Sequence, residues 1–492
     1  MKALKRTSII LAALFALVLV FYAEENWRGK RAWEKCKAEL EAKGAVLDWD
    51  KFIPPPVPDD QNFFKAPNMA EWFVGRGAAE LSKRLQSTNE DLTTSVSAAT
   101  NLIATPEIAK NYLSWSDQFE PDFDLMRAAL KRPYARMDGD YSVPYVQPIP
   151  NFLAVRAVAQ VLSQRAHCYF LLNEPEKALD ELTLLNDSRR LLEGAPTGKP
   201  MTLVAAMINV AVTGLYADTI AEGFQRQVWQ EPQLAVLQGQ FKEINLPPIV
   251  ASAFKMELAS HIHSYAHTNG TTPASHYFTD LSGLYQMADL VLDDASASGK
   301  AKASAISRWL KYPTSLLLKF APRGWAYQNV AYCAEIESKP LDGFDLEHDS
   351  ISPRVVNEVD HNLNLLHRHK SPSKLLAAIV IPNTAKATQT LAFNQTKANE
   401  AQIACALERY RLAHGEYPGT LDAIVPQFIE KLPHDLIGGK PVIYRPTAEG
   451  KFLLYSIGWN ETDDDGQDGG NDFTIGDWVW KNQPQMNTDS HR

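Results

Sequence analysis

The sequence predicts a mainly α-helical protein with an N-terminal membrane anchor and stalk helix, a helical central domain and a C-terminal α+β module. Three features lead to this prediction. An uncharged segment follows the basic N-terminus, as in a membrane-spanning helix. Apolar residues then recur at intervals of three and four, the period of a buried helical face. Near the C-terminus the pattern changes to one long helix followed by two runs typical of strands.

Length and composition limit the class of protein. A chain of 492 residues is too long for one ordinary core, so we expect two or three domains. A hydrophobic content of 45% with 22% charged residues is typical of folded globular proteins. The net charge of −9, without a basic stripe, argues against nucleic acid as a partner. The cysteines are far apart and form no CxxC motif, so we predict mostly buried thiols at Cys36, Cys168, Cys333 and Cys405.

Residues 1–23 are predicted to form an uncleaved signal anchor. Thr7–Ala23 carries no charge and lies near the lower limit of length for a spanning helix, where about 20 residues are typical. The alternative is a cleaved signal peptide, which requires small residues at the first and third positions before the cut. For a cut after Ala23 the third position is Phe21, which is bulky. We therefore favour a single-pass anchor.

The charges that flank the anchor bear on its orientation. Three cations within residues 1–6 favour a cytoplasmic N-terminus. Arg28, Lys30 and Arg31 follow the apolar segment and compete with them, although two glutamates come first. We expect the protein in the inner (cytoplasmic) membrane, with the bulk of the chain extracytoplasmic.

Residues 24–68 are predicted to form a stalk helix and a proline-rich linker. Glu24–Lys43 is rich in Glu, Lys, Arg and Ala, which are strong helix formers. Phe52–Pro67 contains consecutive prolines, which lack N–H donors and fix φ. We expect this second segment to be an extended, semi-rigid spacer.

Residues 69–370 are predicted to form the helical domain. The segment 152–172 has apolar residues at helical spacing, and Pro175 then lies near the start of a second helix. This hairpin is similar to a single tetratricopeptide-type helix pair. No second copy follows at a repeat length, so we favour a helical hairpin of an ordinary α domain. Pro200–Ala217 is uncharged and could be a second membrane span, but its polar residues favour a central buried helix.

Residues 371–492 are predicted to form an α+β module. The apolar run Leu375–Asn383 ends at a proline and is followed by a long polar helix. The runs "PVIYR" and "KFLLYSIGW" then flank "PTAEG", which indicates a β-hairpin. The acidic segment Ser338–Ser350, which precedes this module, is expected to be a surface loop.

The C-terminal region resembles the major pseudopilin of type II secretion systems. The resemblance is carried by "ALERYRLAHGEYPGTLDAIVPQFIEKLPHD", "PVIYR", "FLLYSIG" and the acidic loop that follows. It implies a globular head. Pseudopilins begin with an apolar helix bearing a glutamate near its start, whereas here the anchor has none before Glu24 and the similar region begins at residue 371. The module is therefore expected not to polymerise. The layout also resembles that of uncharacterised large anchored envelope proteins carrying such a module.

The loop "NETDDDGQDGGND" after the last predicted strand is a candidate calcium site. The resemblance implies calcium bound through aspartates and backbone carbonyls, and calcium prefers six to eight oxygen ligands. The implied ligands are Asp472 first, then Asp463 and Asp465, with Asn460 and the carbonyl of Ser456 as weaker candidates. The alternative is an acidic, solvated turn. A true EF-hand is rejected, because the first and last residues of the pattern and its strand-like flanks do not match.

Four residues near the middle of the chain are a second candidate site. Glu257, His261, His263 and His267 lie within eleven residues, and the latter two histidines have metal-ligand spacing on a helix. They lack the HExxH order, and only His276 is near in sequence as a further ligand. Solvated or core-edge histidines are the alternative.

The sequence therefore favours a non-enzymatic role. We expect a membrane-anchored extracytoplasmic scaffold or interaction protein, associated with secretion or pilus-type machinery and carrying a structural calcium ion. Two alternatives stay open. One is a metal-assisted hydrolase built around His261, His263 and His267, and the other is a module of the helical domain that binds a peptide or glycan.

Overall fold

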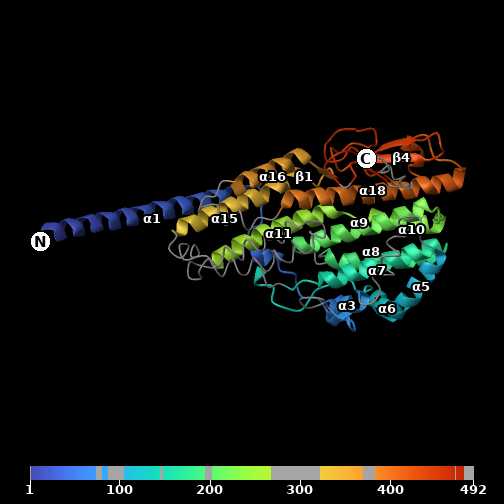
Figure 1. The fold of residues 1–492 in the computed structure, drawn as a ribbon, viewed down its shortest axis with the longest axis horizontal. Coiled ribbons are helices and arrows are strands. Elements are labelled where there is room, and N and C mark those ends of the chain that lie inside the picture. Colours follow the sequence, from blue (N-terminus) through green and yellow to red (C-terminus); the bar gives the residue numbers. More distant parts are fainter. Residues whose placement is uncertain are drawn as a thin grey trace.

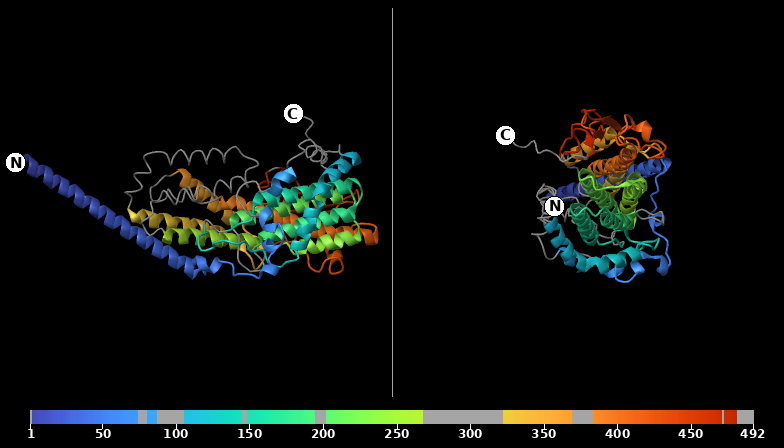
Figure 2. Two further views of the ribbon diagram at one scale, coloured as in Figure 1. Left: turned by 90° about the horizontal axis from the view of Figure 1, so that it is seen from below. Right: turned by 90° about the vertical axis from the view of Figure 1, so that its right-hand side faces the viewer.

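The computed structural model shows an elongated protein from which one long helix projects (Figures 1 and 2). It describes residues 2–73, 80–86, 105–144, 148–193, 202–267, 322–368, 383–470 and 472–480. The protein is mainly helical, with small antiparallel sheets near the C-terminal end, as predicted.

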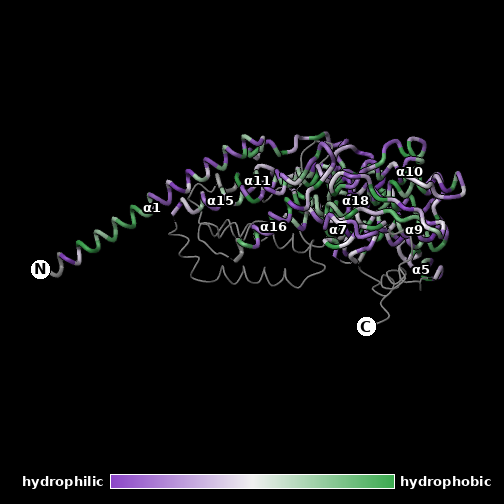
Figure 3. The backbone as a smooth tube through the Cα atoms, turned by 90° about the horizontal axis from the view of Figure 1, so that it is seen from above, coloured by the Kyte–Doolittle hydropathy of each residue, from purple (hydrophilic) through white to green (hydrophobic). Residues whose placement is uncertain are grey.

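Helix α1 (Lys2–Ala42) carries both the predicted anchor and the predicted stalk. Its 41 residues form one unbroken helix, about 60 Å long at 1.5 Å per residue. The most apolar 18-residue window of this helix is 0% buried, and Figure 3 shows this apolar stretch clear of the body. The remainder of α1 packs along α15 (Arg323–Ser338). The stalk is therefore part of the body and does not separate it from the anchor.

The expected proline-rich spacer is also packed on the body. It contains three short 3-10 turns, Trp49–Phe52, Asp59–Gln61 and Phe63–Lys65. Trp49 and Phe63 are each 1% exposed, and Nε1 of Trp49 donates to the carbonyl of Tyr141 at 2.8 Å. The prolines prevent an α-helix, as predicted, and they stay half-buried or exposed. The aromatic residues on either side of them are buried and fix the segment to the body.

The body contains helices of 5 to 31 residues. In chain order they are α2 (Met69–Phe73), α3 (Glu80–Gln86), α5 (Pro106–Ser116), α6 (Glu120–Ala129), α7 (Phe152–Leu171), α8 (Pro175–Arg189), α9 (Leu203–Gln225), α10 (Glu231–Lys242), α11 (Leu246–His267), α15, α16 (Pro353–Arg368) and α18 (Thr384–His414). Further 3-10 turns are Asp117–Phe119, Arg190–Leu192, Lys339–Gly343 and Leu421–Ile424. Helices α7 and α8 form the predicted hairpin, in which Pro175 is the first residue of α8.

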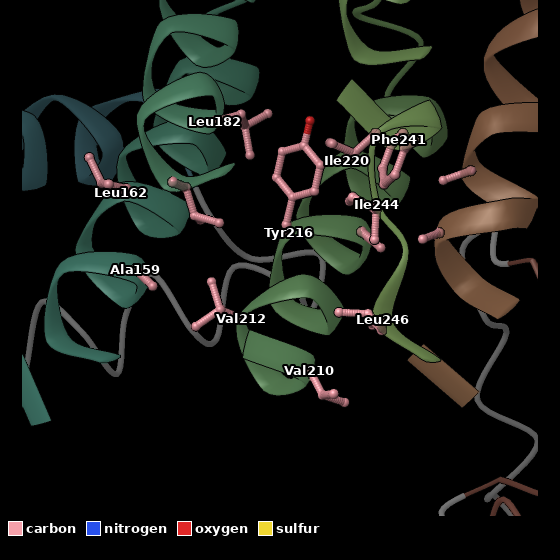
Figure 4. Close-up of a cluster of buried hydrophobic side chains, with 14 of the residues drawn as sticks. Ala159, Leu162, Leu182, Val210, Val212, Tyr216, Ile220, Phe241, Ile244 and Leu246 are labelled. Carbon is pink, nitrogen blue, oxygen red and sulfur yellow. The ribbon is translucent and has the colours of Figure 1, made fainter. Parts of the chain in front are cut away.

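Helix α9 is the predicted central buried helix. It is long and apolar enough to cross a membrane, but 78% of its most apolar window is buried inside the protein. Asn209 and Thr213 are 0% exposed, so its polar residues lie inside the core. Figure 4 shows Tyr216 of α9 between Leu182 of α8 and Phe241 of α10. These contacts identify α9 as a core helix.

The C-terminal module consists of α18 and a three-stranded antiparallel sheet. The strands β3 (Ile443–Pro446), β4 (Phe452–Ser456) and β5 (Trp478–Val479) pair in that order. The β3–β4 hairpin is the predicted one, whereas the two-residue strand β5 was not predicted. A second small hairpin, β1 (Phe344–Asp345) with β2 (Ser350–Ile351), lies in the expected surface loop. The apolar run at 375–382 lies outside the described residues.

Candidate functional site

The candidate calcium loop connects β4 to β5 on the side of the module that faces away from α9 and α10 (Figure 1). Glu461 and Asp465 both have a φ of 58°, a left-handed conformation that is uncommon for residues other than glycine. At these two residues the backbone changes direction, so the loop folds back towards the sheet. The carboxylates of Asp463 and Asp465 therefore lie beside β3.

Asp463 and Asp465 lie together beside β3. Nη1 of Arg445 is 3.0 Å from Oδ1 of Asp465, and its Nη2 is 3.8 Å from Oδ2 of Asp463. The hydroxyl of Tyr455 donates to Oδ1 of Asp463 at 3.0 Å. One arginine thus offsets part of the repulsion between two of the predicted ligands.

The other three predicted ligands have different surroundings. Oδ1 of Asp472 accepts hydrogen bonds from the backbone and the hydroxyl of Thr474, which lower the pKa of Asp472 below its usual value. Nδ2 of Asn460 donates to Asp464 at 2.8 Å. Ser456 is buried, and its hydroxyl donates to Asp435 at 2.8 Å. The five predicted ligands therefore share one loop and its preceding strand, but they do not form one cluster of side chains.

Sequence reasoning missed two buried carboxylates that organise the loop. Asp477 is 0% exposed and accepts hydrogen bonds from the backbone of Asp464 and Gly466, at 3.1 and 2.7 Å. Asp435 accepts from the backbone of Ile437 and Ile457. Burial raises the pKa of both carboxylates above the ordinary value. The only sequence signal is an aspartate beside an apolar strand, which does not reveal its backbone partners.

Beneath the loop lies Glu400 of α18, which is 1% exposed. Among the described residues, its Oε1 has no hydrogen-bond partner. Burial and the neighbouring charge of Asp435 raise its pKa well above the ordinary value. An unpartnered buried oxygen next to a second carboxylate is a place where a proton or a cation stabilises the structure.

The oxygen donors of this region fit calcium by their chemical type. In the part of the chain that the structure describes, no three His, Cys, Asp or Glu side chains converge as metal ligands. Backbone carbonyls and water would therefore supply the remaining ligands of a bound cation. The calcium site stays a prediction.

Helix α18 is enclosed by its own chain. The sheet and the loops cover one side of it, while α9 and α10 cover the other (Figure 1). Gln395 joins it to the turn between α10 and α11, because its Oε1 accepts from the backbone N–H of Leu246 at 2.8 Å and its Nε2 donates to the carbonyl of Ile244 at 3.1 Å. Arg409 reaches Glu231 of α10 at 2.8 Å. The module is thus built into the helical body.

A cavity of about 620 Å³ lies between α6, α7 and α8. At its floor, Arg165 is 2% exposed and donates to Glu181, Asp117 and Glu120 at 2.8, 2.9 and 2.9 Å. Oε2 of Glu181 is buried without a hydrogen-bond partner among the described residues, and Nη2 of Arg127 lies 4.0 Å from it. Burial raises the pKa of Glu181 despite its bond to Arg165. This cavity can accept a hydrogen-bond donor or a cation.

Of the predicted histidine site, the structure describes the side chains of Glu257, His261 and His263, and these have separate partners. Nδ1 of His261 contacts Glu337 of α15 at 2.7 Å, whereas the ring of His263 lies 6.3 Å from that of Trp49. Glu257 is half-buried and accepts from the backbone N–H of Leu203 at 3.2 Å. The side chain of His267, and His276, lie outside what the structure describes. His261 and Glu257 thus link helices, an arrangement that gives the hydrolase alternative no support.

Comparison with known proteins relates part of this chain to a secretion component. Over 123 residues it is 33% identical to the type II secretion system core protein G of Pseudomonas aeruginosa. The aligned part covers 21% of this chain and 83% of that protein. No protein-family model matches the chain, and no solved structure is significantly similar to it.

Proposed function

Since the chain belongs, through 21% of its length, to the family of the type II secretion system core protein G, a major pseudopilin, we propose that it is a membrane-anchored scaffold of the cell envelope. The module would present its sheet and acidic loop to secretion or pilus-type machinery. The helical body would hold the module in place on the extracytoplasmic side of the inner membrane.

The enclosure of α18 is the observation that carries this proposal. A subunit that polymerises through its long helix must offer one face of that helix to its neighbours. Here α9 and α10 occupy that face, held by the contacts of Gln395 and Arg409. A module enclosed in this way is a docking head of a larger protein.

The membrane anchor is supported by the exposed apolar part of α1. Residues such as Ile9, Phe15 and Leu17 are 65 to 68% exposed, which is unfavourable in water at roughly 25 cal/mol per Å² of apolar surface. Burial in a bilayer removes this cost. The same helix continues into the body, so the anchor and the scaffold form one continuous element.

A structural calcium ion in the acidic loop is part of the proposal. Asp463, Asp464 and Asp465 are consecutive, and one arginine pairs with two of them. A cation that binds the folded loop and not the unfolded chain stabilises the fold by mass action. Asp472, Asp463 and Asp465 are the proposed side-chain ligands, with Asn460 and the carbonyl of Ser456 next.

Shearing of intact cells tests the scaffold proposal. The full chain, produced in cells with an active type II secretion system, is expected in the membrane fraction and absent from filaments sheared off the surface. Core protein G, followed in the same cells, is the positive control for filament assembly. Recovery of intact full-length chain in sheared filaments would contradict the proposal.

A second candidate function, a ligand-binding module, is favoured by the cavity at Arg165. Oε2 of Glu181, which has no partner among the described residues, and the exposed Asp180 favour a cationic group in this cavity. Nζ of Lys177 already lies over the ring of Tyr169, 5.5 Å from its centre, so the cavity accepts a cation beside an aromatic ring. Calorimetry of the full chain with a lysine-containing tripeptide, against its glutamate counterpart, tests this. Binding of the lysine peptide that weakens in Asp180→Asn supports the module, and no heat with either peptide excludes it for this ligand class.

A further inference from the structure

The depth of the body relative to the apolar segment of α1 follows from helix geometry. The helix is unbroken from Lys2 to Ala42, and each residue advances it by about 1.5 Å. The uncharged segment ends at Ala23, so Asn26 and Gly29 lie roughly 5 to 9 Å beyond it. The headgroup layer of a bilayer extends about 5 to 8 Å beyond the hydrocarbon on each side. If the apolar segment spans the membrane, these residues lie at the level of the headgroups.

The first turn of α15 is fixed at that same level. The backbone N–H of Gly324 donates to Oδ1 of Asn26 at 2.8 Å. The two helices touch closely, because a Cβ added to Gly29 would lie 2.0 Å from the carbonyl oxygen of Gly324. These contacts hold the start of α15 at the same depth as Asn26.

A buried carboxylate locks the two helices together at this point. Glu25 is 9% exposed and accepts from Nε1 of Trp325 at 2.9 Å and Nε2 of Gln328 at 3.2 Å. Arg28 donates to its other oxygen at 2.8 Å. Three donors satisfy one carboxylate, so this end of the body is rigidly attached to the anchor.

The side chains at this end have the composition of a membrane interface. Trp27 is 61% exposed with Arg31 over its ring at 5.3 Å, and the rings of Phe21 and Trp325 are 6.3 Å apart. Tryptophan and cations are enriched at the level of lipid headgroups. The cations of this end are Arg28, Lys30, Arg31 and Arg323. They outnumber its glutamates by four to three, and the third glutamate, Glu34, lies 3.7 Å from Lys30.

We propose that the start of α15 and the adjoining turns of α1 form a binding surface for anionic lipid headgroups, here named the headgroup surface. It comprises Trp27, Arg28, Lys30, Arg31, Arg323 and Trp325. Its occupant follows from its continuity with the membrane segment and from the excess of positive charge, which complements the phosphodiester and acidic headgroup of a lipid such as phosphatidylglycerol. The inference rests on the proposed anchoring by α1. It adds that the body stands directly on the bilayer, at a fixed angle, without a spacer.

Site-directed spin labelling of the full chain in bilayers tests the depth. Labels are placed singly at Leu14, Arg323 and Lys339, in a chain whose half-buried Cys36 is replaced by serine. Lys339 follows the other end of α15, roughly 24 Å along the helix axis from Arg323, and is the matched control. The depth of each label is measured from its rates of collision with oxygen, which concentrates in the bilayer, and with a nickel chelate, which stays in water. We expect oxygen to collide more often with the label at Leu14 and the nickel chelate with the label at Lys339. The label at Arg323 should give intermediate rates.

The outcomes separate this inference from the anchoring on which it rests. If the label at Leu14 is not in the bilayer, the anchoring proposal fails. If the label at Leu14 is in the bilayer while Arg323 behaves as Lys339 does, the anchor stands and the headgroup surface is wrong.

Lipid preference tests the chemistry of the headgroup surface. We expect the full chain to associate preferentially with spin-labelled phosphatidylglycerol over phosphatidylcholine. Replacing Arg31 and Arg323 by glutamine should reduce this preference roughly fivefold for each cation removed. The control variant, Lys37→Gln with Lys339→Gln, removes one cation of α1 and one just after α15, both away from the membrane, and should leave this preference unchanged. Equal association with both lipids in the unaltered chain would overturn the proposed ligand class.

Discussion

Nδ1 of His261 lies 2.7 Å from Oε1 of Glu337, and this contact joins α11 to α15 inside the protein. Burial alone would lower the pKa of His261, but the charges of Glu337 and Glu257 outweigh it and raise the pKa above 6.5. For Glu257, a carboxylate, burial has the opposite effect and raises the pKa above 4.5. Both groups therefore bind a proton more tightly in the folded than in the unfolded chain.

Stability should consequently depend on pH in a defined direction. A group whose pKa is raised by folding stabilises the fold below its unfolded pKa, and this contribution is lost as the pH rises through the folded pKa. For His261 the loss begins above about pH 6.5. We expect the Tm to fall between about pH 6 and pH 9, and to fall less in His261→Gln. His348→Gln, at an exposed histidine, is the control. An equal fall in the wild type and in His261→Gln would contradict the assigned pKa shift.

The ion pair between Arg165 and Glu181 predicts a non-additive effect on stability. Both side chains are almost fully buried, at 2% and 4% exposure. Arg165→Leu should lower the free energy of unfolding by about 3 to 5 kcal/mol, because it leaves a buried carboxylate without its cation. The double variant Arg165→Leu with Glu181→Leu should recover a large part of this loss. Denaturant unfolding of the wild type, Arg165→Leu, Glu181→Leu and the double variant measures the coupling. A double variant as unstable as the sum of the two single ones would contradict it.

The close contact of α1 with α15 predicts an effect of Gly324→Ala. A Cβ at this position would lie 1.7 Å from the backbone oxygen of Glu25, so the helices must separate. Cys36 reports on this, since burial and the nearby glutamates raise its pKa to about 11 and its thiol contacts the carbonyl of Ala331. We expect faster alkylation of Cys36 in the variant at neutral pH.

Gly239 of α10 offers a matched control for that substitution. A Cβ there meets no atom within 4 Å, so Gly239→Ala should leave the alkylation rate unchanged. Because glycine is a poor helix former, the same change should stabilise the protein by about 0.5 to 1 kcal/mol. Identical alkylation rates for Gly324→Ala and Gly239→Ala would refute the contact between α1 and α15.

The calcium proposal predicts an ion-specific rise in Tm. The full chain is compared in excess EDTA, in millimolar calcium and in millimolar magnesium. At a concentration 100 times the dissociation constant, calcium should add about 2.7 kcal/mol of stability. This gain should be lost in Asp472→Ala and kept in Glu347→Gln, at an exposed carboxylate of another loop. The absence of any calcium effect would leave the loop as a solvated turn held by Arg445.

Local patterns in the sequence were sufficient for much of the fold. The hairpin of α7 and α8 follows from helical periodicity with Pro175 at a helix start, and the β3–β4 hairpin follows from alternation around a glycine-containing turn. The burial of α9 follows from polar residues such as Asn209 in an otherwise apolar helix. In each case the signal lies within about twenty consecutive residues.

Features that depend on distant partners could not be predicted in this way. Glu25 pairs with Trp325, 300 residues away, so the sequence of the stalk gave no sign that it is packed. Trp49 and Phe63 are buried and so fix to the body a segment whose prolines alone indicate a spacer. Asp477 supports the acidic loop through backbone N–H groups, and these partners become visible only when the chain has folded.

The most direct test of the account concerns Gln395, which bonds α18 to the turn between α10 and α11. Gln395→Leu in the full chain leaves the backbone N–H of Leu246 and the carbonyl of Ile244 without this partner. Each unpaired buried group costs about 1 to 3 kcal/mol. Gln427→Leu, at an exposed glutamine of the same module, is the control. If the module is built into the body, denaturant unfolding should show a loss of about 2 to 6 kcal/mol for Gln395→Leu and none for Gln427→Leu. Equal stability of the two variants would contradict the enclosure of α18 and with it the proposed scaffold.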